Sequence, residues 1–208
     1  MISKLPIFSI LTFILTFWLS PNNQEKKKII FFGDSITAGY GISLEEAFPN
    51  LNQKKIDSLG LNYEVVNAGL SGEASAGGLD RIDWILQGKP DIFVLELGGN
   101  DGLRGLSIQE TEANLKAMID KVRQAKPSTK ILLAGMQIPP NLGQEYTESF
   151  RKVFAKVAKD KKVDLIPFLL ENVGGEEDLN QSDGIHPNRA GHKIVAETVW
   201  RYLEKYVK

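Results

Sequence analysis

Ser35 stands where a hydroxyl could act as a nucleophile, in the stretch FFGDSITAGYG (residues 31–41). It follows an apolar run directly and lies in a turn that contains three glycines. A serine nucleophile needs a base within hydrogen-bond reach, a group that orients the base, and donors for an oxyanion. His186, in DGIHPN, is a candidate base, and Asp183 lies three residues upstream in the same predicted loop. These three residues could therefore carry nucleophilic catalysis.

Each of these residues also has a simpler explanation when it is taken alone. A serine after a strand is more often a helix cap or turn residue, and a glycine-rich strand-to-helix turn can bind phosphate. The turn lacks both G-x-x-x-x-G-K-[ST] and G-x-G-x-x-G, and no lysine follows it. His186 could cap a helix, with Asp183 an acid beside the helix start. We interpret His192, the second histidine, as an ordinary residue of the last helix.

Two further segments supply candidate donors for an oxyanion. Gly72 lies in NAGLSGEAS after the second predicted strand, and Asn100 lies in GGND after the third. A glycine amide in a turn can point freely toward a substrate, and the asparagine offers a side-chain amide. Glycines and Asn-Asp pairs are common in loops, so each signal is weak alone. Together with Ser35, Asp183 and His186, they fill every required role at one edge of a predicted sheet.

Five short apolar runs predict the strands that would position these residues: 28–32, 63–67, 91–97, 130–135 and 163–167. They have the continuous apolar character of strands buried on both faces of a parallel sheet. Helical periodicity separates them, most clearly after Ser107, which has capping-box spacing to Glu110 in a helix that should end before Pro127. The prediction is an α/β fold, a three-layer α/β/α sandwich with about five parallel strands and a ligand site at their carboxyl ends.

Composition limits the domain count and the partners. A chain of 208 residues with 42% hydrophobic content suits one domain with a sizeable core. The formal net charge is −1 and no long basic stretch occurs, which argues against nucleic acid as a partner. Cysteine is absent, so disulfides and thiolate chemistry are excluded, and two histidines are a poor source of zinc ligands. We therefore expect neither a metal nor another cofactor.

The first 25 residues differ from the rest. Lys4 is the only charged residue among the first 24, and Leu5 to Leu19 is almost entirely apolar. As a helix this run would span only about 22 Å, short of a hydrocarbon core of about 30 Å. We interpret residues 1–25 as an export signal with a short linker, which implies a periplasmic or extracellular protein. An uncleaved membrane anchor is the alternative, because no alanine precedes Ala38 and three lysines follow at 26–28.

The motifs GDSI, LSGEAS, GGND and DGIHP resemble, in this order, the four conserved blocks of the SGNH (GDSL-type) hydrolases. ELGGNDGLRG and DGIHPN are most similar to the branch of bacterial thioesterase I, lysophospholipase and arylesterase. The resemblance implies a flavodoxin-like SGNH hydrolase domain over residues 26–208. It also implies Ser35 as nucleophile, His186 as base and Asp183 as the residue that orients it. The oxyanion hole would consist of the amides of Ser35 and Gly72 and the side chain of Asn100.

Residues beside the nucleophile are interpreted structurally. Asp34 is expected to brace the turn as a hydrogen-bond acceptor, and Glu96 to be a buried carboxylate inside the third strand. We expect the Ser35 hydroxyl to be exposed. Departures from the family pattern are small: Ile36 replaces the leucine of GDSL, and Glu73-Ala74 replaces an acid-threonine pair.

The loops at 102–107 and 137–144 should border the site, because they leave the same sheet edge as Asn100. Their apolar residues predict an acyl groove formed by Leu103, Leu106, Ile138, Pro139 and Leu142. The predicted function is a serine esterase for short- to medium-chain acyl esters, including aryl esters, and the resemblance adds thioesters and lysophospholipids. Two alternatives remain open: a carbohydrate O-acetyl esterase of the same superfamily, and a noncatalytic anion-binding α/β module.

Overall fold

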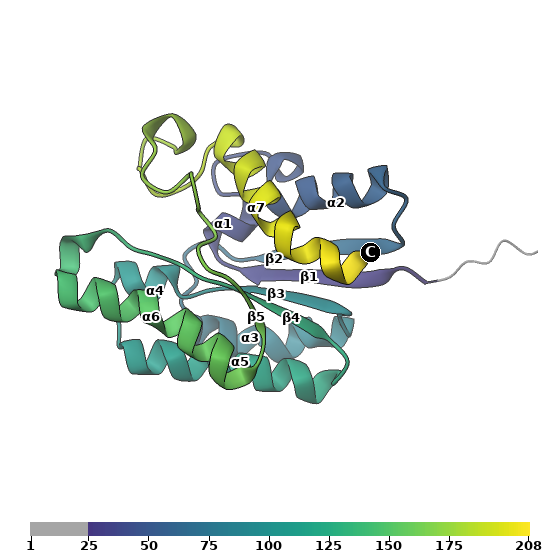
Figure 1. Cartoon of the computed structure of the whole chain (residues 1–208), viewed down its shortest axis with the longest axis horizontal. Coiled ribbons are helices and arrows are strands. Elements are labelled where there is room, and N and C mark those ends of the chain that lie inside the picture. The colour runs from purple at the N-terminus through teal and green to yellow at the C-terminus, as the bar shows by residue number, and fades with distance from the viewer. Residues whose placement is uncertain (1–24) are drawn as a thin grey trace, which may run out of the picture.

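A five-stranded parallel sheet forms the centre of the computed structural model, which describes residues 25–208 (Figure 1). The strand order is β2-β1-β3-β4-β5, and every neighbouring pair is parallel. The strands are β1 (Lys27–Gly33), β2 (Tyr63–Gly69), β3 (Ile92–Glu96), β4 (Lys130–Ala134) and β5 (Asp164–Ile166). All five predicted strands are present, so the predicted parallel sheet is confirmed.

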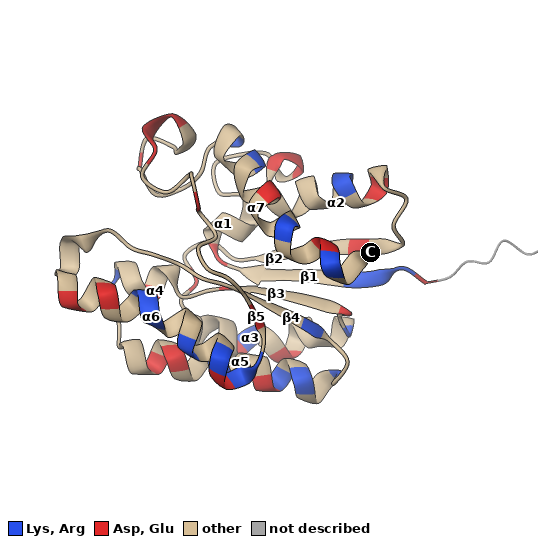
Figure 2. Ribbon diagram, viewed as in Figure 1, with Lys and Arg blue, Asp and Glu red and all other residues tan. Residues whose placement is uncertain are grey.

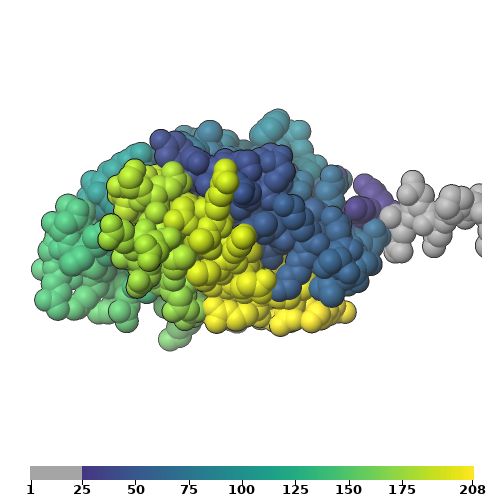
Figure 3. Space-filling view, turned by 90° about the horizontal axis from the view of Figure 1, so that it is seen from above, coloured from purple at the N-terminus to yellow at the C-terminus, as the bar shows by residue number. Residues whose placement is uncertain are grey.

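Helices cover both faces of the sheet and complete the predicted three-layer sandwich (Figure 1). One face carries α2 (Phe48–Ser58) and α7 (Arg189–Val207), which lie side by side in blue and yellow in Figure 3. The other carries α3 (Ser75–Ile85), α5 (Ile108–Ala125) and α6 (Gln144–Lys161). Short elements complete the chain: α1 (Ser35–Ala38), α4 (Gly99–Leu103), and 3-10 turns at Leu44–Glu46, Leu86–Gly88, Pro140–Leu142 and Glu177–Leu179.

Local sequence signals explain where the helices begin and end. Ser107 caps α5 by accepting the N–H of Glu110 at 3.2 Å, and the helix ends before Pro127, as predicted. Asn188 caps α7 in the same way, accepting the N–H groups of Ala190 and Gly191. The cap at Asn188 fixes the point where the preceding loop, which carries His186, turns into α7.

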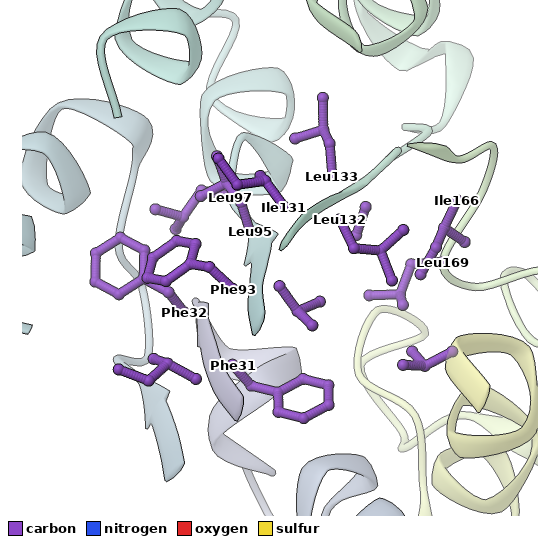
Figure 4. Close-up of a cluster of buried hydrophobic side chains, with 14 of the residues drawn as sticks. Phe31, Phe32, Phe93, Leu95, Leu97, Ile131, Leu132, Leu133, Ile166 and Leu169 are labelled. Carbon is purple, nitrogen blue, oxygen red and sulfur yellow. The ribbon is translucent and has the colours of Figure 1, made fainter. Parts of the chain in front are cut away.

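The core consists of apolar side chains on both sides of the sheet (Figure 4). Phe31 and Phe32 are adjacent on β1 and point to opposite faces, as successive strand residues do. Phe31 packs edge-on against Phe48 of α2 with ring centroids 5.5 Å apart, and Phe32 packs against Phe93 of β3 at 5.6 Å. Burying one such side chain stabilises the fold by about 1.5–3 kcal/mol. Charged residues gather mainly on the outer surfaces of the helices, as Figure 2 shows.

The strand order reverses direction between β1 and β3, which makes the carboxyl ends of these two strands the topological switch point. In open parallel sheets the crevice at this point is where ligands bind. Ser35 follows β1 and Asn100 lies in α4 just after β3, so the fold brings these two residues to the switch point.

The predicted export signal or anchor at residues 1–25 lies almost wholly outside the described residues. Among the helices within 25–208, none combines the length and apolar character needed to cross a membrane.

Candidate active site

Ser35 is the first residue of α1, a single helical turn that starts where β1 ends. Asp34 caps this turn, because its Oδ1 accepts the N–H of Ile36 at 3.0 Å. The N–H of Asp34 itself donates to Glu96 Oε2 at 3.1 Å. Asp34 therefore braces the turn as predicted, and Glu96 is the predicted buried carboxylate. Gly39 ends the turn with φ of 77°, a left-handed conformation that favours glycine.

His186 lies within hydrogen-bond distance of Ser35 on one side and Asp183 on the other. Its Nε2 is 2.8 Å from Ser35 Oγ, and its Nδ1 is 2.7 Å from Asp183 Oδ2. The other carboxylate oxygen of Asp183 accepts the N–H groups of Ile185 and His186 at 2.9 and 3.0 Å. Burial is the largest single effect on the pKa of Asp183 and raises it, but the two backbone N–H groups and the imidazole together outweigh burial and lower the pKa to about 2. The carboxylate is therefore ionised at neutral pH.

The expectation of an exposed Ser35 is wrong. The residue is only 7% exposed, because its side chain is enclosed between the cavity described below and the imidazole of His186. The Ser35 hydroxyl therefore faces the cavity, where a bound molecule can reach it, and has little contact with bulk solvent.

Asn100 connects the turn of Ser35 to the loop of Gly72. Its Nδ2 donates to Asp34 Oδ2 and to the carbonyl oxygen of Glu73, both at 3.1 Å. Gly72 has φ of 79°. Within residues 25–208 the N–H groups of Ser35 and Gly72 donate no hydrogen bond, which leaves both available to a ligand. The three predicted oxyanion donors are therefore held by one connected set of loops.

Two buried carboxyl groups lie beneath the nucleophile. Burial raises the pKa of Asp34 to about 6, against an ordinary value of 3.8, despite hydrogen bonds from Ile36 and Asn100 that lower it. Burial and the neighbouring charge of Asp34 raise the pKa of Glu96 well above 4.5. The pair therefore retains a proton at pH values where an exposed carboxyl group would be ionised.

A cavity of about 460 Å³ opens beside Ser35, His186 and Asn100. Leu103, Ile138 and Pro139 line it, in agreement with the position predicted for them. Its lining does not include Leu106 and Leu142, which are 41% and 43% exposed.

The rest of the apolar wall was not predicted. It comprises Ile36, Met136, Phe168, Leu170 and Ile185. Met136 follows β4, and Phe168 and Leu170 follow β5, so the rule that placed the other residues at the carboxyl edge of the sheet could also have found these three. Ile185 lies inside the DGIHP motif itself.

His192 lies inside α7, as expected, and is buried against α2 with 1% exposure. Its Nδ1 accepts the N–H of Phe48 at 3.2 Å, and its ring stacks on the Phe48 ring. Burial lowers the pKa of His192 to about 4, so it is neutral at neutral pH. Within residues 25–208, no group of three or more His, Asp or Glu side chains is arranged to hold a metal ion.

Comparison with known proteins places this geometry in a family. The model of the GDSL-like lipase/acylhydrolase family matches residues 31–194. Esterase TesA of Pseudomonas aeruginosa is 44% identical over 177 residues, which span 85% of this chain and 87% of the relative. Thioesterase 1/protease 1/lysophospholipase L1 of Escherichia coli is 38% identical over 180 residues, or 86% and 84% of the two chains.

A solved structure agrees with the sequence relatives. The psychrotrophic esterase EstA of Pseudoalteromonas sp., in a structure inhibited by monoethylphosphonate, is 33% identical and superposes with a TM-score of 0.82. The match covers 87% of this chain and 98% of that one. With this fold and these relatives, the chain belongs to the GDSL-like lipase/acylhydrolase family, the SGNH ester hydrolases to which its four motifs point.

Proposed function

We propose that Ser35 hydrolyses acyl esters through a covalent acyl-enzyme. The Ser35 Oγ attacks the carbonyl carbon of the ester while His186 Nε2, 2.8 Å away, takes the hydroxyl proton. The tetrahedral intermediate expels the alcohol, which takes that proton from His186. Water then attacks the acyl-enzyme and gives a proton to His186. His186 returns this proton to Ser35 Oγ as the bond to the acyl group breaks, and the acid is released.

Asp183 supports His186 in this scheme by geometry and charge. Its Oδ2 accepts the hydrogen bond from Nδ1, which fixes the tautomer with Nε2 free to accept the serine proton. Because its pKa lies near 2, Asp183 keeps its negative charge when the imidazole becomes positive. The imidazolium that forms during each proton transfer is thereby stabilised.

The oxyanion would be held by the N–H groups of Ser35 and Gly72 and by Asn100 Nδ2. The two backbone groups have no partner among the described residues, which supports their role as donors to a substrate. Asn100 is tied to Asp34 on one side and to Glu73 on the other, so its amide is oriented before substrate arrives.

The cavity supports an apolar acyl chain as the group bound next to Ser35. Its volume of about 460 Å³ lies within the range of about 300–1,000 Å³ typical of small-molecule sites, and aliphatic side chains form much of its wall. Each buried methylene contributes up to about 0.8 kcal/mol, so kcat/KM should rise over several carbons of chain length. We propose short- to medium-chain acyl esters as substrates. We add thioesters and lysophospholipids because the Escherichia coli relative is named as a thioesterase and a lysophospholipase.

The observation that carries this proposal is the hydrogen-bonded array Asp183–His186–Ser35 at the mouth of an apolar cavity. A fluorescent alkyl phosphonate tests it directly, because only an activated serine reacts with this reagent. We expect labelling of the wild type and of the control variant Ser43→Ala, whose hydroxyl is exposed and bonded to Glu46. We expect no labelling of Ser35→Ala or His186→Ala. Labelling of Ser35→Ala would refute the nucleophile.

Substrate class is tested with p-nitrophenyl esters from acetyl to dodecanoyl, measured beside an acetylated oligosaccharide. We expect kcat/KM to rise with chain length and then level off when the cavity is full. An acetyl optimum combined with faster turnover of the oligosaccharide would move the assignment to a carbohydrate O-acetyl esterase.

We also propose that residues 1–25 direct export. The short apolar run after Lys4 is the observation behind this, and amino-terminal sequencing of the protein from a fractionated host tests it. Loss of the segment in the periplasm or medium would support a cleaved signal. Retention of the intact segment in the membrane fraction would support an anchor instead.

A further inference from the structure

The base and the nucleophile come from segments that are about 150 residues apart in the sequence, and their relative position decides proton transfer. General-base catalysis requires the two atoms to lie about 2.6–3.2 Å apart. We infer that Gln181 and Tyr40 form a clasp that holds the loop of His186 against the turn of Ser35, and that both are positioning residues for the reaction. This inference rests on the proposed base role of His186.

Four hydrogen bonds close a ring through the two segments. The N–H of Tyr40 donates to the carbonyl oxygen of Ser35 at 3.0 Å, and the Tyr40 carbonyl accepts Gln181 Nε2 at 2.6 Å. The N–H of Gln181 donates to the carbonyl oxygen of His186 at 2.8 Å. The ring closes through His186 Nε2 and Ser35 Oγ at 2.8 Å. Displacing any one member therefore changes the geometry of the catalytic pair.

Gln181 also stiffens the loop that carries the base. Its side-chain Nε2 donates to the Pro187 carbonyl at 3.1 Å, and its backbone carbonyl accepts the N–H of Gly184 at 2.9 Å. In Figure 3 the yellow-green loop before α7 lies against the dark blue segment that follows β1. Gly41 has φ of 76°, a left-handed conformation that favours glycine, and a Cβ at this position would displace the amide end of the Gln181 side chain.

The ring of Tyr40 covers one side of the imidazole. The centroids of the Tyr40 and His186 rings are 4.7 Å apart, with the ring planes inclined at 44°. This ring contact restricts rotation of the imidazole and so helps to hold Nε2 toward Ser35 Oγ. Within residues 25–208 the Tyr40 hydroxyl makes no hydrogen bond, and the residue is 52% exposed. The contribution therefore belongs to the ring and not to the hydroxyl.

Neither residue lines the acyl cavity, which separates the clasp from substrate binding. Losing Gln181 or Tyr40 should lower kcat and leave KM nearly unchanged. Removing an apolar residue of the wall, such as Ile138, should mainly raise KM for longer acyl chains.

The experiment compares Gln181→Met, Tyr40→Leu and Tyr40→Phe, with kcat, KM and the rate of phosphonate labelling as readouts. Active enzyme is counted by the final extent of labelling, so partial unfolding does not mimic a lower kcat. We expect a loss of about 10-fold in kcat and in labelling rate for Gln181→Met. Tyr40→Leu should lose about 3- to 10-fold, and Tyr40→Phe should retain wild-type values, because the ring remains.

Gln53→Met is the matched control, because Gln53 also joins backbone groups but lies far from the site. Its Nε2 donates to the Tyr63 carbonyl at 3.3 Å and its Oε1 accepts the N–H of Val65 at 2.6 Å. This variant should lower Tm while kcat stays at the wild-type value. Wild-type kcat and labelling in Gln181→Met and Tyr40→Leu, with His186→Ala inactive, would overturn the clasp and leave the proposed function standing. If Gln181→Met does not fold, the comparison of Tyr40→Leu with Tyr40→Phe decides the question, because wild-type kcat in Tyr40→Leu would overturn the clasp.

Discussion

Replacing Asn100 with alanine tests the oxyanion hole at its one side-chain donor. Both hydrogen atoms of Nδ2 have partners in the free enzyme, namely Asp34 Oδ2 and the Glu73 carbonyl, each at 3.1 Å. In the transition state the oxyanion must share this amide with those partners. The amide therefore acts through the orientation of its N–H dipole as well as through the hydrogen bond itself, and the alanine variant loses both.

The magnitude follows from two separate effects of the same change. Loss of one oxyanion donor typically lowers kcat about 10²–10³-fold, or about 2.7–4 kcal/mol of transition-state stabilisation. Loss of the two hydrogen bonds, each worth about 1 kcal/mol, lowers the free energy of unfolding by about 1–2 kcal/mol, because Asn100 is only partly buried. We therefore expect a large fall in kcat, little change in KM and a moderate fall in Tm.

The assay is steady-state hydrolysis of a p-nitrophenyl ester, with Tm measured on the same preparations. Asn114→Ala is the control, because Asn114 donates to Ser75 Oγ at 3.0 Å and lies outside the cavity wall. It should lower Tm without lowering kcat. A kcat for Asn100→Ala within about threefold of the wild type would refute the oxyanion assignment.

Three other predictions concern the two histidines, the buried Asp34 and the absence of a metal from the mechanism. His186→Ala should abolish hydrolysis, whereas His192→Leu should retain kcat and lower Tm, because it loses a buried contact with Phe48; the reverse pattern would overturn the base assignment. Because the pKa of Asp34 is raised from 3.8 to about 6, the native state binds its proton more tightly than the unfolded state. The contribution of Asp34 to stability is thus greatest below about pH 4 and declines as pH rises through about 6. The change in Tm caused by Asp34→Asn should therefore be more positive at pH 8 than at pH 4, and equal changes at both pH values would contradict this. A chelator should leave kcat unchanged, and inactivation that added metal reverses would argue against the metal-free mechanism.

The sheet and the placement of the catalytic motifs followed from the sequence because both depend on short-range signals. The apolar runs that became β1 to β5 are continuous and bounded by turn residues, as strands buried on both faces require. A parallel sheet then sends every loop after a strand to one edge. Ser35 and Asn100 could therefore be brought together without any knowledge of side-chain contacts.

Side-chain direction within the loops could not be predicted in the same way. Leu106 and Leu142 belong to the expected loops but do not line the cavity, whereas Phe168 lines it and comes from a segment that no motif marks. The enclosure of Ser35 and the contact of Gln181 with the Tyr40 carbonyl depend on how the loop before α7 folds over α1. Such contacts join segments far apart in the sequence, and neither periodicity nor motif spacing encodes them.

The buried carboxyl groups beneath Ser35 indicate that this region is arranged for geometry at the expense of stability. Glu96 Oε2 accepts the N–H of Asp34 and the hydroxyl of Thr37, one residue before and two residues after Ser35, and so ties the turn to β3. Burying a carboxyl group is unfavourable unless it is fully hydrogen-bonded, and Glu96 Oε1 has no partner within the described residues. A buried apolar residue at this position would remove that penalty but would leave both ends of the turn without an acceptor. Asn100 lies in α4, shortly after β3, so the Glu96 carboxyl group fixes the nucleophile relative to the strand that leads to the oxyanion donor. This explains why an unfavourable group occupies the switch point of the sheet.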